Sequence, residues 1–213
     1  MPARARENEH AHTLTAAAGA AAAVLLAGCG PQAATGDDSP YNGSEVKGAF
    51  TLPDADFTDS KGEEYNLRED SAGAYTAVFF GFTNCPDICP TTMADMAQAV
   101  AELDEAERDR LNVVFVTADP DRDDPELLDM WLGSFDPSFT GLTGDLETTD
   151  AAASELGISI ERPEDREGDY QVGHGSQVLL FSPEGESELM WRYQTGPDAI
   201  AEDLGALLDG EGA

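Results

Sequence analysis

The sequence predicts an α/β fold, in which helices cover a mixed central sheet. Apolar segments with the period of strands alternate with segments that have the period of helices, an order typical of parallel strands joined by helices. Two short segments, Phe50–Leu52 and Glu64–Leu67, flank a polar turn and predict an N-terminal β-hairpin. A second strand pair near the C-terminus is joined by a tight turn. The sheet is therefore expected to contain both parallel and antiparallel strands.

Apolar periodicity and turn residues predict the individual elements. The continuous apolar runs 75–82 and 111–118 are typical of central strands that are buried on both faces. Pro125 suits the first turn of a helix, where its missing N–H is not needed, with Asp123 or Asp124 as the N-cap. The expected elements are the hairpin over 48–67, strand 75–82, a helix from about 91 to 107, strand 111–118, a helix from 125, strand 139–142, helix 148–156, strands 177–181 and 189–193, and helix 197–208.

The chain is strongly acidic. Its 213 residues include 43 Asp and Glu against 11 Lys and Arg, which gives a formal net charge of −32. Such a charge disfavours nucleic acids and anionic lipid surfaces as partners. The acidic residues are spread from Asp37 to Glu211 rather than gathered in a tail, which favours a halophilic adaptation to high salt. The alternative is an acidic surface that binds a basic partner or attracts metal cations.

The N-terminal segment has the pattern of an export signal. Arg4 and Arg6 precede an apolar stretch, Thr13–Ala27, that is too short to span a membrane. The stretch ends in Leu26-Ala-Gly-Cys29, which resembles a bacterial lipobox, so Cys29 is expected to carry the lipid. The alternative is an ordinary cleaved signal peptide in which Cys29 is incidental.

Three segments are expected on this basis, and they locate the protein outside the cytoplasm, anchored to the outer face of the cell membrane as a lipoprotein. They are a lipoprotein signal peptide over 1–28, a flexible tether over 29–45 that begins at the lipidated Cys29, and a folded domain over 46–213.

Two thiols lie at the turn between the strand 75–82 and the helix that follows it. Cys85 and Cys89 are separated by Pro-Asp-Ile, and Pro90 suits the first turn of the helix. The N-terminal end of a helix stabilises a thiolate, which is both the nucleophile and the metal-binding form of cysteine. A structural disulfide is an alternative, but a bridge that closes so short a loop removes little entropy from the unfolded chain. A redox or metal-binding role is therefore favoured.

One histidine remains once the targeting segment, with His10 and His12, is set aside. His174 lies between Gly173 and Gly175, just before the strand 177–181. Two thiolates and one imidazole form a soft set of three ligands, which suits Cu(I) and holds Cu(II) with an added weak ligand. A structural zinc site normally has a fourth protein ligand. Copper is therefore the favoured metal, although a single loop histidine is more often a surface or hydrogen-bonded residue.

The chain resembles the SCO/SenC family over about 46–208. The resemblance rests on Cys85-Pro-Asp-Ile-Cys89-Pro after Phe-Phe-Gly-Phe-Thr-Asn, on Val-Thr-Ala-Asp119-Pro-Asp-Arg-Asp, on Gly141-Leu-Thr-Gly and on the late His174. It implies a thioredoxin-like fold and one copper ion per chain, bound by Cys85, Cys89 and His174. It also implies delivery of copper to the binuclear copper site of cytochrome c oxidase, or reduction of the thiols of that site.

The resemblance extends to further positions and partners. Asp87 and Asp119 match family positions near the site, and supporting roles are expected for both. Gly173 departs from the family, which usually has an aspartate before the histidine, and the change removes a group that could orient the imidazole. A lipid anchor replaces the transmembrane helix that is frequent in the family. The expected partners are the copper-site subunit of the oxidase and an extracytoplasmic copper donor, and the expected oligomeric state is a monomer.

The sequence is compatible with two functions. A metallochaperone would transfer copper by ligand exchange, whereas a thiol-disulfide reductase would use Cys85 as the attacking thiolate and Cys89 as the resolving thiol of a redox-active disulfide. Ordinary thioredoxins have one residue fewer between their cysteines and lack a counterpart of His174, which favours the metal. A thiol peroxidase is disfavoured because the proline and threonine spacing typical of peroxiredoxins is absent around Cys85.

Overall fold

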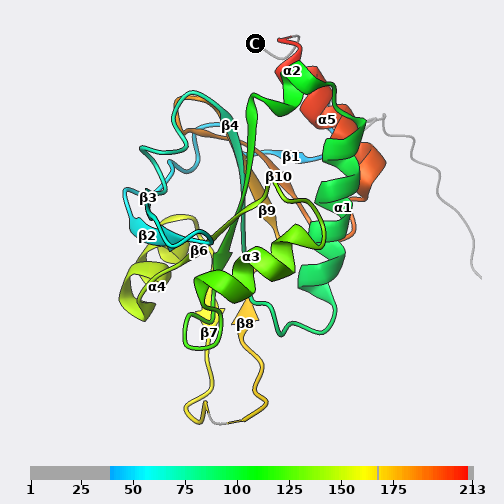
Figure 1. Cartoon of the computed structure of the whole chain (residues 1–213). Helices are drawn as coiled ribbons and strands as arrows, with labels where there is room; N and C mark the ends of the chain where they lie inside the picture. The colour runs from blue at the N-terminus through cyan, green and yellow to red at the C-terminus, as the bar shows by residue number, and fades with distance from the viewer. Residues whose placement is uncertain (1–38, 167, 211–213) are drawn as a thin grey trace, which may run out of the picture. The chain divides into compact units, whose positions relative to one another are not determined.

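The computed structural model describes residues 39–166 and 168–210 (Figure 1). The predicted signal peptide, Cys29 and the first part of the tether lie outside the described residues. Within the described ranges, no helix combines the length and the apolar character needed to cross a bilayer.

The main sheet has eight strands and mixed direction. Strand β4 is parallel to β5, and β5 is parallel to β6, whereas β9 is antiparallel to β4. The predicted mixed sheet is therefore confirmed. In spatial order the strands are β1 (Ser44–Glu45), β10 (Ser187–Trp191), β9 (Val178–Phe181), β4 (Tyr75–Gly81), β5 (Leu111–Thr117), β6 (Thr140–Thr143), β2 (Asp56–Asp59) and β3 (Glu64–Asn66).

Helices cover both faces of this sheet (Figure 1). Successive residues of β4 point to opposite faces, as in any strand: Phe79 packs in one apolar cluster and Phe80 in the other. The buried apolar residues of α1 (Ile88–Glu102), α3 (Pro125–Gly133) and α5 (Pro197–Leu208) belong to the Phe79 cluster. Those of α4 (Leu146–Glu155) belong to the Phe80 cluster, together with Phe57 of the N-terminal hairpin. Two buried layers therefore fix β4 and the loop that follows it.

Two predicted elements differ from the structure. The hairpin forms, but its first strand is β2 rather than Phe50–Leu52, and Thr51 instead makes an isolated bridge to Glu186. The helix predicted over 91–107 begins three residues earlier and divides into α1 and α2 (Glu105–Arg108). The division has a local cause, because Asp104 and Glu107 form a capping box that starts a new helix.

The other helix boundaries follow the prediction closely. Helix α3 begins at Pro125, and its N-cap is Asp124, whose side chain accepts a hydrogen bond from the Leu127 N–H. Asp123, the alternative cap, is fully buried and bonds elsewhere. The closing helix α5 has the predicted bounds.

The folded part begins before residue 46. Strand β1 pairs with β10, and the backbone N–H groups of Asn42 and Gly43 donate to the buried carboxylate of Asp203 at 2.7 and 2.8 Å. The same carboxylate accepts from the Trp191 indole at 2.8 Å. Residues 42–45, predicted as part of the tether, therefore contact the folded domain, and Asn42 and Gly43 add to the Trp191 hydrogen bond that satisfies this buried carboxylate.

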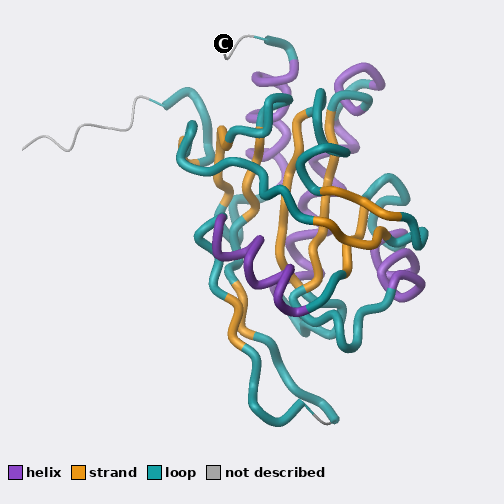
Figure 2. The backbone as a smooth tube through the Cα atoms, turned by 90° about the vertical axis from the view of Figure 1, so that its left-hand side faces the viewer, coloured by secondary structure: helices purple, strands orange, loops and turns teal. Residues whose placement is uncertain are grey.

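The charged segment 161–173 contains an element that the sequence pattern did not predict. Strands β7 (Ile160–Glu161) and β8 (Gly173–His174) form a separate two-stranded ladder, in which Ile160 pairs with His174. Figure 2 shows the ladder continuing into a long loop that extends away from the main sheet. His174 therefore lies on a short strand rather than on the expected loop.

Candidate metal centre

Three side chains that the sequence singled out meet at the end of β4. The two sulfur atoms of Cys85 and Cys89 and a ring nitrogen of His174 all lie within 4.8 Å of one another. Among residues 39–166 and 168–210, this is the one group of three or more His, Cys, Asp or Glu side chains close enough to share a metal ion. The cysteines come from the β4–α1 loop and the first turn of α1, and the histidine comes from β8.

The two thiols have different environments. Cys85 is half-buried, and its sulfur accepts a hydrogen bond at 3.4 Å from the backbone N–H of Cys89 in the first turn of α1. Cys89 is fully buried, and burial raises the pKa of its thiol. A soft cation that replaces the proton would offset this unfavourable burial of a thiolate.

The imidazole of His174 is held in the orientation that a metal ligand requires. Its Nδ1 lies 2.8 Å from the carbonyl oxygen of Gly175, which can only accept, so we assign the proton to Nδ1. The lone pair of Nε2 then faces the Cys89 sulfur, 3.3 Å away. The rings of Phe79 and Phe82 contact the imidazole edge to face, each with centroids 5.7 Å apart. Burial lowers the pKa of His174, which favours the neutral form that binds metals.

Gly81 at the end of β4 contributes a close approach that the sequence analysis did not identify. A Cβ at this position would lie 2.9 Å from the Cys89 sulfur and 2.8 Å from the Phe115 ring. A side chain here would therefore displace the sulfur or the ring. The sequence signal that could have revealed this contact is a glycine at the end of an otherwise apolar strand.

A pocket borders the cluster on the side of Cys85 and His174. An apolar pocket of about 290 Å³ borders Cys85 and His174, whereas Cys89 lies behind them and does not line it. The lining residues are Phe82, Cys85, Pro86, Asp87, Ile88, Gln171, Val172, Gly173 and His174. A partner can therefore reach the site from the side of Cys85.

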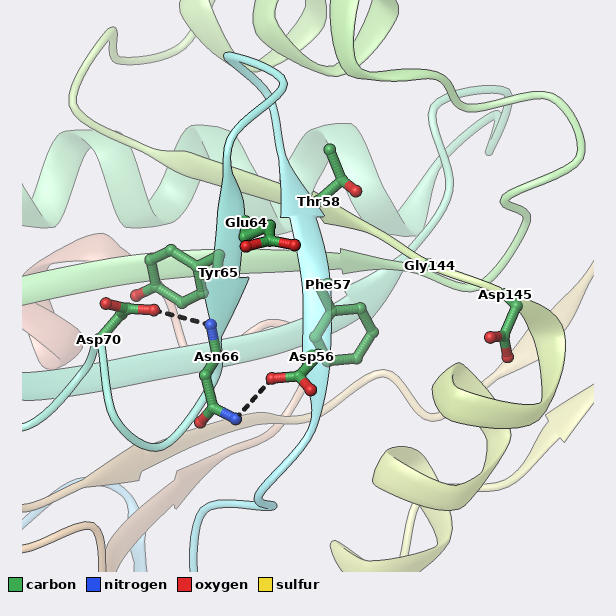
Figure 3. Close-up of a pocket in the computed structure, with 9 residues that line it drawn as sticks. All are labelled: Asp56, Phe57, Thr58, Glu64, Tyr65, Asn66, Asp70, Gly144 and Asp145. Carbon is green, nitrogen blue, oxygen red and sulfur yellow. Dashed lines mark hydrogen bonds between the residues drawn. The ribbon is translucent and has the colours of Figure 1, made fainter.

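A larger depression lies elsewhere, against the β2–β3 hairpin, and it has a different chemistry (Figure 3). It measures about 520 Å³ and is bordered by several carboxylates. Two of them are engaged by Asn66: its side chain donates to Asp56 at 2.8 Å, and its backbone N–H donates to Asp70 at 2.7 Å. No soft ligand lines this depression, so the cysteine and histidine cluster is the better candidate metal centre.

The two aspartates expected to support the site lie at different depths. Asp87 occupies the N-cap position of α1, but its side chain accepts no capping hydrogen bond, and it lines the apolar pocket. Asp119 is only 1% exposed and bonds to Tyr170 and Arg122 rather than to the three candidate ligands. Asp87 is thus a rim residue, and Asp119 lies behind the site.

Gly173, the residue before His174, lies opposite an acidic residue in the structure. It pairs with Glu161 across the β7–β8 ladder, and a Cβ at residue 173 would lie 3.3 Å from the Glu161 Cβ. An aspartate at this position would therefore stand beside another carboxylate.

The SCO1/SenC family model matches residues 39–209, nearly all of the described chain. The chain belongs to the SCO1/SenC family. A Stutzerimonas stutzeri protein described as a putative copper-binding protein is 34% identical over 160 residues, which are 75% of this chain and 78% of that protein. The mitochondrial protein SCO2 of Saccharomyces cerevisiae is 30% identical over 177 residues, which are 80% of this chain and 57% of that protein. This SCO1/SenC chain thus spans little more than half the length of the yeast relative.

Solved structures of SCO1/SenC proteins have the same fold. Apo Sco1 from Thermus thermophilus matches with a TM-score of 0.69 at 30% identity, over 81% of this chain and 99% of that one. Yeast Sco1 with copper bound matches with a TM-score of 0.62 at 28% identity, over 81% and 93% of the two chains. These matches confirm the predicted thioredoxin-like fold.

Two further solved structures share the fold. A SCO1/SenC family lipoprotein from Bacillus anthracis matches with a TM-score of 0.66 at 25% identity, over 76% of this chain and 97% of that one. BsSco, described as a member of the Sco family of cytochrome c oxidase assembly proteins, matches with a TM-score of 0.61 at 22% identity, over 79% and 98% of the chains. At that identity the BsSco match shows the fold alone.

Proposed function

We propose that this protein is a copper chaperone, which binds one copper ion through Cys85, Cys89 and His174 and delivers it to the binuclear copper site of cytochrome c oxidase. The observation that carries the proposal is the orientation of His174: its Nδ1 faces a carbonyl oxygen and its Nε2 faces the Cys89 sulfur at 3.3 Å. A buried pair of thiols with an imidazole lone pair directed at them is a ligand set for a soft cation.

The cargo ion would be held by groups of unequal accessibility. Cys89 lies among apolar side chains that exclude water, whereas Cys85 and His174 border the pocket. Incoming ligands of the oxidase subunit would reach the ion from the pocket, and the chain would release it by ligand exchange. Copper bound in yeast Sco1, and the copper-binding description of the Stutzerimonas stutzeri relative, support the choice of metal.

Anchoring at the outer face of the membrane through a lipid on Cys29 belongs to the same proposal. The lipobox-like residues before Cys29 and the Bacillus anthracis lipoprotein of the family support it. An anchored chaperone would share the membrane surface with the oxidase, and a multiply acylated cysteine would hold it there firmly.

A second candidate function is reduction of a disulfide in the oxidase copper site. The half-buried Cys85, with a helix N–H donating to its sulfur, and the buried Cys89 support it. The Cys85 thiolate would attack one sulfur of the partner disulfide and release the other as a thiolate. Cys89 would then attack the Cys85 sulfur and release the second partner thiol. The two electrons come from this chain, which ends with a Cys85–Cys89 disulfide and needs an external dithiol before the next turnover.

An anaerobic Cu(I) titration of the full chain in competition with a chelator tests the chaperone proposal. We expect one tightly bound copper per chain, lost in Cys85→Ser and Cys89→Ser and weakened in His174→Ala. Cys29→Ser is the matched control, because it removes the third thiol and should leave the stoichiometry at one. Unchanged copper affinity in His174→Ala would refute the three-ligand site. Absence of copper binding in the wild type, with reduction of a disulfide peptide, would favour the reductase.

A further inference from the structure

The turn between β5 and α3 contacts two segments that lead to the metal centre, one before Cys85 and one before His174. It is closed by the carbonyl oxygen of Asp119, which accepts hydrogen bonds from the backbone N–H groups of Arg122 and Asp123 at 3.1 and 3.0 Å. The side chains of this turn, residues 119–123, extend in two directions. One set reaches the loop that carries Cys85, and the other reaches the segment that carries His174.

The first set holds the cysteine loop. The carboxylate of Asp123 is fully buried and accepts hydrogen bonds from the backbone N–H of Thr83 at 2.9 Å and from its hydroxyl at 2.6 Å. It also accepts from the Thr117 hydroxyl, at 2.6 Å, at the end of β5. Thr83 precedes Cys85 by two residues, so these bonds fix the start of the loop that carries the more accessible thiol.

The second set holds the histidine segment. The Tyr170 hydroxyl donates to Asp119 at 2.6 Å, and the Arg122 side chain donates to the Tyr170 carbonyl oxygen at 3.0 Å. The guanidinium of Arg122 also lies 3.6 Å above the Tyr170 ring and forms an ion pair with Asp119. Tyr170 is buried and precedes His174 by four residues. These contacts fix the approach of the chain to β8.

This second connection joins two acidic segments. The turn and the loop before β8 are both acidic, and they would repel each other without compensation. Arginines supply this compensation. Arg162 donates to the Ala118 carbonyl oxygen at 2.9 Å, Arg166 pairs with Asp121 at 2.5 Å, and Arg122 pairs with Asp119. Three of the 11 basic residues of the chain therefore connect this loop to the end of β5 and the turn after it.

We propose that the β5–α3 turn sets the distance between the cysteines and the histidine, with Tyr170, Arg122 and Asp119 as positioning residues for His174, and Thr83 and Asp123 as positioning residues for Cys85. None of the five is a ligand; each acts through a ligand. The copper readout of this proposal rests on the proposed function, whereas the position of His174 can be measured without copper.

A double-mutant cycle on the full chain separates positioning from general destabilisation. Tyr170→Phe removes the hydroxyl that bonds to Asp119, and we expect it to weaken Cu(I) binding roughly fivefold. In a His174→Ala background the same change should have almost no effect, because the ligand through which it acts is absent. Thr83→Val acts through the cysteines and should weaken binding by a similar factor in both backgrounds.

Tyr65→Phe is the matched control, since its hydroxyl bonds to Ser71 in the N-terminal hairpin region. It should leave copper affinity unchanged in both backgrounds. An equal loss for Tyr170→Phe with and without His174 would overturn the proposal and assign Tyr170 a purely structural role.

A copper-free measurement keeps the two proposals apart. In the apo protein, ¹⁵N NMR should show the Nδ1-protonated tautomer of His174 in the wild type and in Tyr65→Phe, and altered, broadened ring signals in Tyr170→Phe. If the wild type binds no copper but these signals respond as expected, the positioning role stands and the chaperone proposal fails. If the His174 signals do not respond to Tyr170→Phe, the positioning role fails whatever the copper titration shows.

Discussion

The Nε2 of His174 lies 3.3 Å from the Cys89 sulfur, although the two residues are 85 positions apart in the chain. Cys89 is fixed by α1, which packs in the main core, whereas His174 lies on a two-residue strand outside the main sheet. The contact therefore depends on how well the segment before β8 is held, and Arg122 holds it through the ring and the carbonyl oxygen of Tyr170.

Arg122→Lys should lower the free energy of unfolding by about 1–2 kcal/mol, because lysine cannot reproduce both the stacking on Tyr170 and the bonds to Asp119 and the Tyr170 carbonyl. Urea unfolding measures the change. Arg166→Lys is the matched control: its pair with Asp121 is exposed, and it should change stability by less than about 0.5 kcal/mol. Equal losses for the two variants would contradict the prediction.

Gly81→Ala should be destabilising by about 1–3 kcal/mol, because the added methyl group would overlap the Cys89 sulfur and the Phe115 ring. It should also weaken copper binding by moving the sulfur. Gly133→Ala provides the comparison, since nothing lies within 4 Å of a Cβ at that position in α3, and it should leave copper affinity unchanged and stability equal or slightly higher. Chemical unfolding and the Cu(I) titration together check both effects.

Cys85→Ser and Cys89→Ser should differ in stability although both abolish tight copper binding. The serine hydroxyl at the fully buried position 89 would be desolvated, which costs about 1–2 kcal/mol, whereas a serine at the half-buried position 85 remains close to solvent. The measurement is thermal or urea unfolding of the reduced proteins. A larger loss for Cys85→Ser would show that the environments of the two thiols are reversed in solution.

Acid should destabilise the protein partly through His174. Burial holds its pKa below the ordinary value of 6.5, so the unfolded chain takes up a proton that the folded chain does not as the pH falls through that value. Stability from this residue is therefore present above about pH 6.5 and is lost below it. In His174→Ala, the decrease in unfolding free energy between about pH 7.5 and pH 5.5 should be smaller than in the wild type. Parallel pH profiles for the two proteins would rule this contribution out.

Gly173→Asp should be destabilising by about 0.5–1 kcal/mol, because the new carboxylate would stand directly across the ladder from Glu161. Adding Glu161→Gln should restore most of the loss, and high salt should have the same effect by screening. The double variant is also the appropriate protein in which to ask whether an aspartate before His174 raises copper affinity. A loss that persists in the double variant and in high salt would point to a steric cause.

The sequence predicted the parts of the fold that depend on local pattern. The continuous apolar run 75–82 became β4, the Pro125 signal marked the start of α3, and the two cysteines lie at the predicted strand-to-helix turn. The break between α1 and α2 has a sequence signal, because Asp104 and Glu107 have the spacing of a capping box. The prediction missed this signal because the helical period of apolar residues continues across the break.

Other features depend on contacts distant in sequence and could not be predicted from pattern. The β7–β8 ladder is only two residues long on each side and lacks apolar alternation; contacts of Arg162 and Tyr170 with the end of β5 and the turn after it hold its loop in place. Asp123 and Asp124 were equivalent as helix caps in the sequence. The hydroxyls of Thr83 and Thr117, from two other segments, bond to Asp123 and leave Asp124 as the cap.

Cys85 lines the pocket and Cys89 does not, so the two thiols differ in how easily a partner can reach them. If copper is transferred as proposed, an acceptor sulfur would approach through the pocket that Cys85 and His174 border. We therefore expect the bond to Cys89 to be the last that the departing ion breaks. An intermediate shared between the two proteins would then retain the buried thiolate, and the rate of release would depend on how readily Cys89 regains a proton in surroundings that exclude water.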